Sequence, residues 1–202
     1  MSARRSKLFS ISICRPWGRR VSGTIIAFDL ASKTGVAVGS PGSLPLLLTE
    51  RLGVAGTTQD ARFSACMTLC NRLIRLHQPG EIVIEKPITG KKERDHVSFL
   101  LIGLRACVRA VAHLHGVPVN DHAVNSIRRH FIGQGNLSGA KAKPIVHQRC
   151  LQLGWKPDGP DAADAGALWD FACSMRSRSH QLSTQNDGLL VQRGGNENGE
   201  LR

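Results

Sequence analysis

Short apolar runs mark the first strands of the chain. Residues 24–29 form one such run and end in Asp29, residues 36–38 resume the same pattern, and a third run lies within residues 44–52. Turn-forming residues occupy positions 32–35 between the first two runs. The pattern therefore predicts a β-hairpin with Asp29 near its turn, followed by a third strand.

Residues 81–85 form a further run, in which three apolar residues stand between Glu81 and Glu85. An uninterrupted apolar run of this length is typical of a strand that is buried on both faces beneath helices. Its last residue, Glu85, is then expected where the strand leaves the sheet. Residues 116–119 predict another short strand, after a helical stretch.

Amphipathic stretches with helical spacing separate and follow these runs. They predict helices at residues 58–77, 97–115, 124–131, 140–153 and 161–175. Strands that alternate with helices are typical of an α/β layer in which part of the sheet is parallel. We therefore predict an α/β fold with a mixed sheet flanked by helices.

The two ends of the chain differ in composition from this central part. Residues 1–22 contain six Lys or Arg residues and no acid, and residues 176–202 are rich in Ser, Gln, Asn and Gly. Neither stretch has enough apolar residues to form a core, so we expect a disordered basic arm and a disordered polar tail around a domain at residues 23–175. The sequence has no long apolar segment, and a cytoplasmic protein is expected, with an organelle transit peptide in residues 1–22 as the alternative.

Charge indicates the kind of partner. The formal net charge is +12 and the sequence pI is about 10.2, which favours binding to a polyanion such as nucleic acid or an anionic membrane. Against this basic background, four acids stand out by position: Asp29, Glu85, and the pair Asp161 and Asp164 at the start of the last predicted helix. Carboxylates that converge at one sheet edge can hold Mg²⁺ against a phosphate.

Each acid also has a purely structural interpretation. Asp29 can stabilise a turn, Glu85 can be a solvated strand end, Asp161 can be a helix N-cap, and Asp164 can stabilise the first helical turn. The order and spacing of all four favour a shared site over four separate structural roles.

Three motifs resemble those of the RuvC-type Holliday junction resolvases, which belong to the RNase H-like superfamily. They are Phe28-Asp29-Leu30-Ala31-Ser32-Lys33-Thr34-Gly35, Val83-Ile84-Glu85-Lys86-Pro87 and Asp161-Ala162-Ala163-Asp164-Ala165. A basic, glycine-containing stretch at residues 127–143 resembles a segment of that family that contacts DNA. The resemblance covers residues 23–175 in the family's order and implies an RNase H-like fold with a five-stranded sheet.

The resemblance implies an endonuclease that cuts four-way DNA junctions, depends on Mg²⁺ or Mn²⁺ with two ions per site, and works as a homodimer. Asp29 would bridge both ions, with Glu85 and Asp161 or Asp164 as flanking ligands. The implied DNA-binding residues are Lys86, Lys91, Lys92, Arg94, Arg128, Arg129, Lys141 and Lys143. The outer side of the helix at 97–115, with Leu100, Leu101, Leu104 and Val108, is the expected dimer face, although half of those positions can equally pack on the protomer's own sheet.

One feature departs from the family pattern. Some members have a base-stacking aromatic residue shortly after the catalytic Glu, whereas this chain has Pro87 and Ile88 there and no tyrosine at all. Stacking on an aromatic contributes about 1–3 kcal/mol per base in single-stranded recognition, so the resemblance does not say how the junction centre is opened or which strand is chosen. Two alternatives stay open: an RNase H-like nuclease acting on RNA or an RNA–DNA hybrid, and a non-catalytic nucleic-acid-binding module.

Overall fold

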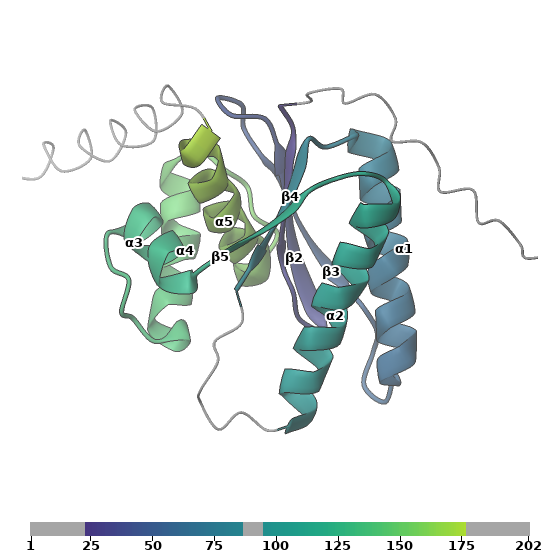
Figure 1. Ribbon diagram of the computed structural model, residues 1–202. Helices are drawn as coiled ribbons and strands as arrows, with labels where there is room; N and C mark the ends of the chain where they lie inside the picture. The colour runs from purple at the N-terminus through teal and green to yellow at the C-terminus, as the bar shows by residue number, and fades with distance from the viewer. Residues whose placement is uncertain (1–22, 87–94, 177–202) are drawn as a thin grey trace, which may run out of the picture.

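The computed structural model describes residues 23–86 and 95–176 (Figure 1). The predicted basic arm at residues 1–22, nearly all of the predicted polar tail and residues 87–94 lie outside the described residues. The last helix ends at Arg176, one residue beyond its predicted end at 175.

A mixed five-stranded sheet forms the centre of the fold, as predicted. Its strand order is β3-β2-β1-β4-β5, with β1 antiparallel to β2 and parallel to β4. The strands are β1 (Ile25–Asp29), β2 (Lys33–Gly39), β3 (Leu46–Arg51), β4 (Glu81–Glu85) and β5 (Val119–His122).

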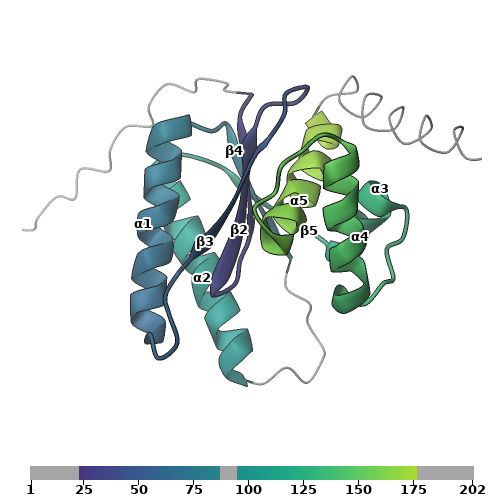
Figure 2. The ribbon, with the colours of Figure 1, turned by 180° about the vertical axis from the view of Figure 1, so that it is seen from behind.

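Helices cover both faces of the sheet. On one face lie α1 and α2, and on the other lies α5 with α3 and α4 outside it (Figures 1 and 2). The helices are α1 (Gln59–His77), α2 (Asp95–Leu114), α3 (Val124–Ile132), α4 (Gly139–Gln152) and α5 (Pro160–Arg176). Within the described residues, no helix combines the length and the apolar character needed to cross a bilayer.

Side chains of β1 point alternately to the two faces of the sheet and so contribute to both halves of the core. Ile26 and Phe28 pack in the cluster beneath α1 and α2, while Ile25 and Ala27 pack in the cluster beneath α5. Successive side chains of a strand point to opposite faces, which is why a fully apolar run marks a strand covered on both sides. The prediction of a doubly covered β4 is confirmed in the same way, because Ile82, Val83 and Ile84 are all buried.

Two predicted strand boundaries are wrong. Strand β2 begins at Lys33, inside the stretch predicted as turn, because its ladder with β3 already starts at the pair Lys33 and Arg51. Strand β5 is Val119–His122 rather than 116–119, because Gly116 has a positive φ of 67° and Pro118 has no N–H for a ladder.

For two of the four positions expected at the dimer face, the alternative of packing on the protomer's own sheet is confirmed. Leu104 and Val108 on α2 are completely buried against the protomer's own core, so they are not available to a partner. The large apolar side chains that α2 exposes include Phe99, Ile102 and Leu114, which are 61%, 62% and 77% exposed.

Candidate active site

Asp29 and Glu85 come together because two parallel strands end side by side. The ladder between β1 and β4 runs from Ile25 and Glu81 to its last pair, Phe28 and Ile84. Asp29 and Glu85 are the next residues of each strand. The carboxyl ends of neighbouring parallel strands lie at one sheet edge, so the two acids share that edge.

A close approach of α5 to β2 brings the other two acids to the same edge. Gly35 is the register partner of Asp29, and a Cβ built at Gly35 would lie 1.9 Å from the carbonyl oxygen of Asp161. Only glycine leaves room for this contact. Asp161 and Asp164, one helical turn apart at the start of α5, therefore lie beside the end of β1.

Asp161 is not the N-cap of α5, so that structural interpretation is wrong. The carbonyl oxygen of Gly159 accepts the first helical hydrogen bond, from the N–H of Ala163 at 3.1 Å, and Pro160 is the first helical residue. The carboxylate of Asp161 is left to interact with side chains instead.

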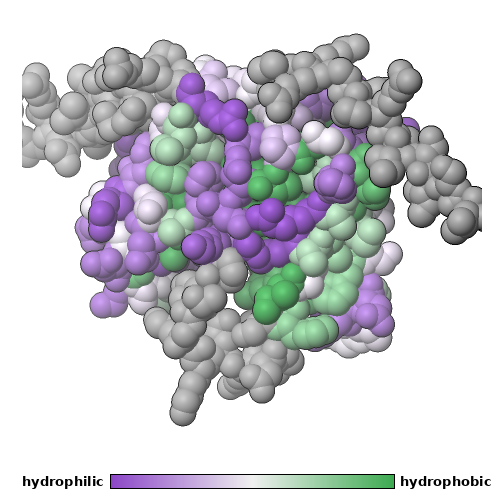
Figure 3. All heavy atoms as spheres, viewed as in Figure 1, coloured by the Kyte–Doolittle hydropathy of each residue, from purple (hydrophilic) through white to green (hydrophobic). Residues whose placement is uncertain are grey.

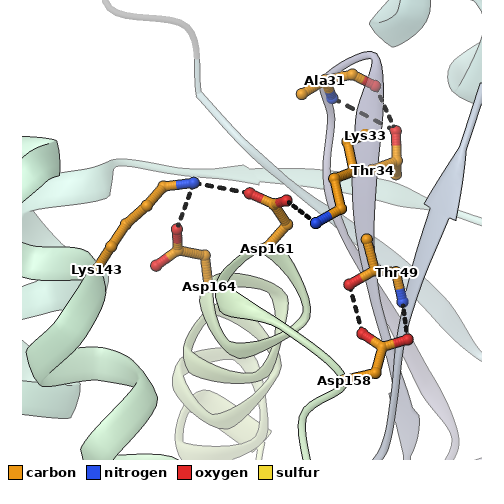
Figure 4. Close-up of polar contacts among 8 residues, drawn as sticks. All are labelled: Ala31, Lys33, Thr34, Thr49, Lys143, Asp158, Asp161 and Asp164. Carbon is orange, nitrogen blue, oxygen red and sulfur yellow. Dashed lines mark hydrogen bonds and ion pairs between the residues drawn. The ribbon is translucent and has the colours of Figure 1, made fainter. Parts of the chain in front are cut away.

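Asp158 fixes the segment that leads into α5. Its Oδ2 accepts a hydrogen bond from the backbone N–H of Thr49 at 2.8 Å, and its Oδ1 accepts one from the Thr49 hydroxyl at 2.5 Å (Figure 4). This contact ties the start of α5 to β3 across 109 residues of sequence. Asp158 was not among the predicted site residues, because nothing in its local sequence indicates so distant a partner.

Lys143 reaches from α4 into the acidic cluster (Figure 4). Its Nζ lies 2.7 Å from Asp161 Oδ1 and 3.6 Å from Asp164 Oδ2, and Lys33 Nζ lies 3.4 Å from the other oxygen of Asp161. Lys143 was predicted to contact DNA. The structure places its ammonium among the carboxylates.

Burial and mutual repulsion perturb the acids strongly. Burial, then the carboxylates of Asp164 and Glu85, raise the pKa of Asp29 from 3.8 to about 8. Burial likewise raises the pKa of Glu85 and of Asp164, against the opposing effect of nearby cations that include Arg128. Buried carboxylates that raise one another's pKa values form a site that favours an added cation.

Asp161 and Lys143 show the opposite, ion-paired behaviour. Burial alone would raise the pKa of Asp161, but hydrogen bonds and charge from Lys143 and Lys33 hold it below its usual range. For Lys143, the carboxylates overcome the effect of burial and raise the pKa of the ammonium. The lysine is thus a monovalent cation that partly neutralises the cluster.

The chemistry of the donors fits a hard divalent cation. Carboxylate oxygens are the ligands of Mg²⁺, and the cluster carries excess negative charge. With the side chains as they stand, no three His, Cys, Asp or Glu groups of residues 23–86 and 95–176 are gathered closely enough to hold an ion. Lys143 takes up carboxylate oxygens that a metal would use.

The remaining predicted DNA-binding residues are exposed or half-buried, or lie outside the described residues. Lys86 follows Glu85 and is exposed, as are Arg129 and Lys141. Arg128 is half-buried and donates from Nη1 to the carbonyl oxygen of Leu137 at 2.8 Å. Outside the described residues are Lys91, Lys92 and Arg94, and also Pro87 and Ile88.

Comparison with known proteins yields RuvC proteins by sequence and by structure, although no family model matches the chain. The crossover junction endodeoxyribonucleases RuvC of Erythrobacter litoralis and Ruegeria pomeroyi are 28% and 29% identical over 105 and 124 residues. These matches cover 52% and 57% of this chain, and 62% and 70% of the two relatives.

Solved structures agree on the fold. Thermus thermophilus RuvC superposes with a TM-score of 0.58 at 18% identity, covering 76% of this chain and 95% of that one. The yeast mitochondrial Holliday junction resolvase Ydc2 superposes with a TM-score of 0.53 at 12% identity, covering 85% of this chain and 84% of Ydc2. In sequence the chain is similar to RuvC proteins, and it shares the fold of Thermus thermophilus RuvC and Ydc2.

Proposed function

We propose that this protein is a metal-dependent endonuclease that cuts phosphodiester bonds in branched DNA, with four-way junctions as its principal substrate. The observation that carries the proposal is the cluster of Asp29, Glu85, Asp161 and Asp164 at one sheet edge, with the pKa of Asp29 raised to about 8. Such a cluster in a chain of net charge +12 suits a cation and a polyanion together. Similarity to proteins named crossover junction endodeoxyribonucleases supports the substrate.

Two Mg²⁺ or Mn²⁺ ions are the proposed cofactors, held by these four carboxylates. When bound, such ions lower the pKa of a water molecule and stabilise charge on the attacking and leaving oxygens of a phosphoryl displacement. Asp29 lies between Glu85 on β4 and the pair on α5, so it would be the central carboxylate of the set. Glu85 and Asp161 or Asp164 would hold metal from its two sides.

Lys143 has to release its carboxylates when the metal binds. Its ammonium contacts Asp161 and Asp164 while its side chain stays 42% exposed, so it can turn toward solvent or a phosphate without crossing the core. A released ammonium beside the scissile phosphate would add positive charge where negative charge develops. We therefore assign Lys143 a place at the reacting phosphate rather than on a distant DNA arm.

The DNA surface extends from this edge over exposed cations. Lys86 follows Glu85 directly, and Arg129 and Lys141 flank the glycine-containing loop between α3 and α4. Backbone N–H groups and cations around such a loop suit phosphate oxygens and carry no sequence information. Binding should thus depend on DNA shape and salt more than on base sequence.

A homodimer is the proposed assembly, because two symmetric nicks in a junction need two active sites and the described domain has one acidic cluster. Apolar side chains gather on the surface over α2 (Figure 3), and Phe99 and Ile102 are exposed apolar residues of this helix. A two-fold pair would present this patch twice. Sedimentation tests the assembly: a mass twice 21.9 kDa is expected, and a monomer with and without junction DNA would exclude the dimer.

A panel of labelled substrates tests the function. A four-way junction, a fork, a linear duplex and an RNA–DNA hybrid are each incubated with Mg²⁺ or Mn²⁺, with Glu85→Gln as the inactive control. Fastest cleavage of the junction is the expected result. Preferred cleavage of the hybrid would assign the protein to the RNA-cutting nucleases of this fold, and binding with no cleavage of any substrate would make it a non-catalytic module.

A further inference from the structure

The carbonyl group of Glu85 lies at the point where the ladder between β1 and β4 ends. The N–H of Lys86 donates to the His122 carbonyl oxygen on β5 at 2.7 Å, and backbone groups alternate in direction along a strand. The backbone groups of Glu85 therefore face β1, where Phe28 and Ile84 form the last pair. The carbonyl oxygen of Glu85 is thus beyond the last ladder position.

Arg105 of α2 supplies a donor at this position. Its Nη1 donates to the Glu85 carbonyl oxygen at 2.6 Å, and its Nη2 donates to Asp121 Oδ2 on β5 at 3.0 Å. The Arg105 side chain is only 16% exposed. One guanidinium therefore joins α2, the end of β4 and β5, and hydrogen bonds with a charged partner are among the stronger ones in proteins.

Asp121 is held from a second side, which fixes the direction of Arg105. Arg109, one helical turn further along α2, donates from Nη2 to the same Asp121 oxygen at 2.7 Å and from Nη1 to the Val119 carbonyl oxygen at 3.5 Å. Arg109 donates no hydrogen bond to Glu85, and its side chain is 44% exposed, more than that of Arg105. The two arginines thus share one anchor, and Arg105 alone connects that anchor to Glu85.

We infer that Arg105, oriented by Asp121, is a positioning residue that fixes the end of β4 and thereby the carboxylate of Glu85. The inference rests on the proposed function, because the position of the Glu85 carboxylate matters for activity only if that carboxylate binds metal. Groups that orient metal ligands typically contribute about 10- to 100-fold to metal affinity or activity. Neither Arg105 nor Asp121 is adjacent in sequence to any predicted site residue.

Four variants of the full chain test the inference: Arg105→Gln, Arg105→Lys, Glu85→Gln and the double variant Arg105→Gln with Glu85→Gln. Arg109→Gln is the matched control, because it removes a guanidinium from Asp121 and leaves the contact with Glu85. Mn²⁺ binding is measured by titration without DNA, and the Mg²⁺ concentration for half-maximal junction cleavage is measured separately. Thermal unfolding of each variant identifies any that fails to fold.

Arg105→Gln should weaken Mn²⁺ binding and raise the half-maximal Mg²⁺ concentration by about 10- to 100-fold, while Arg109→Gln changes both only slightly. The effects of Arg105→Lys on Mn²⁺ binding and on the half-maximal Mg²⁺ concentration should lie between those of Arg105→Gln and Arg109→Gln. If Arg105→Gln does not fold, Arg105→Lys is used in its place. The double variant should bind Mn²⁺ no more weakly than Glu85→Gln alone. Equal effects of the Arg105 and Arg109 variants, or additive effects in the double variant, would overturn the inference.

The same data separate this inference from the proposed function. Unchanged Mn²⁺ binding and cleavage in Glu85→Gln would contradict the proposed function itself. Impaired Glu85→Gln together with wild-type behaviour of Arg105→Gln and Arg105→Lys would overturn only the positioning role.

Discussion

Replacing Gly35 by alanine should disable the site without touching any carboxylate. The added Cβ would lie 1.9 Å from the Asp161 carbonyl oxygen, and an ordinary contact begins at 3.4 Å, so the start of α5 and β2 must separate by about 1.5 Å. The obstacle is backbone on both sides, and a rotamer change cannot relieve it. Overpacking of this kind costs about 1–3 kcal/mol of stability.

The effect on cleavage should exceed the effect on stability. A misplacement of about 1 Å at a reacting centre can reduce a rate about 100-fold, and here Asp161 and Asp164 both move away from Asp29. Urea unfolding and junction cleavage in Mg²⁺ are measured side by side. Gly23→Ala is the control, because its Cβ meets only Ser40, at 3.8 Å. A Gly35→Ala protein as stable and active as Gly23→Ala would refute the close-approach argument.

Three further predictions concern charge. Without metal, the free energy of unfolding should fall as pH rises from about 4 to 8, because folded Asp29 (pKa about 8) binds its proton more tightly than the unfolded chain does. Asp29 alone contributes a slope of up to about 1.4 kcal/mol per pH unit, and urea titrations should show this contribution lost in Asp29→Asn. Mn²⁺ binding should release a proton below pH 8, and the Mn²⁺ affinity should increase as pH rises. Calorimetry in two buffers of different ionisation enthalpy measures the number of protons released, and a value of zero would contradict this prediction. The logarithm of the junction binding constant should fall linearly with the logarithm of the salt concentration, with a slope near −0.9 per phosphate neutralised, and Lys141→Ala should flatten this slope; an unchanged slope would place the DNA elsewhere.

The parts of the site that are local in sequence could be predicted. The strands ending in Asp29 and Glu85 each show an apolar run followed by an acid, and the two acids at 161 and 164 have helical spacing. Burial on both faces follows from the same runs, and the structure confirms it for β1 and β4. These features depend on the nearest neighbours along the chain, so they are visible without the fold.

The parts that depend on distant partners could not be predicted. Gly35 looks like an ordinary turn residue, and only the position of α5 shows that it is a contact point. Lys143 has the appearance of a DNA-binding lysine, and its ion pairs with Asp161 and Asp164 appear only when α4 packs beside α5. Leu104 and Val108 lie on a helix with several apolar sides, and packing alone decides which side is buried.

Cleavage and binding of a labelled four-way junction by the wild-type protein and by Asp29→Asn test the central claim most directly. The wild-type protein should nick the junction in Mg²⁺ or Mn²⁺ and leave it intact in EDTA. Asp29→Asn should bind the junction with similar affinity and fail to cut it, because it removes a metal ligand and leaves the basic surface unchanged. Near-normal cleavage by Asp29→Asn, or wild-type cleavage that persists in EDTA, would contradict a metal-dependent site built on these four acids.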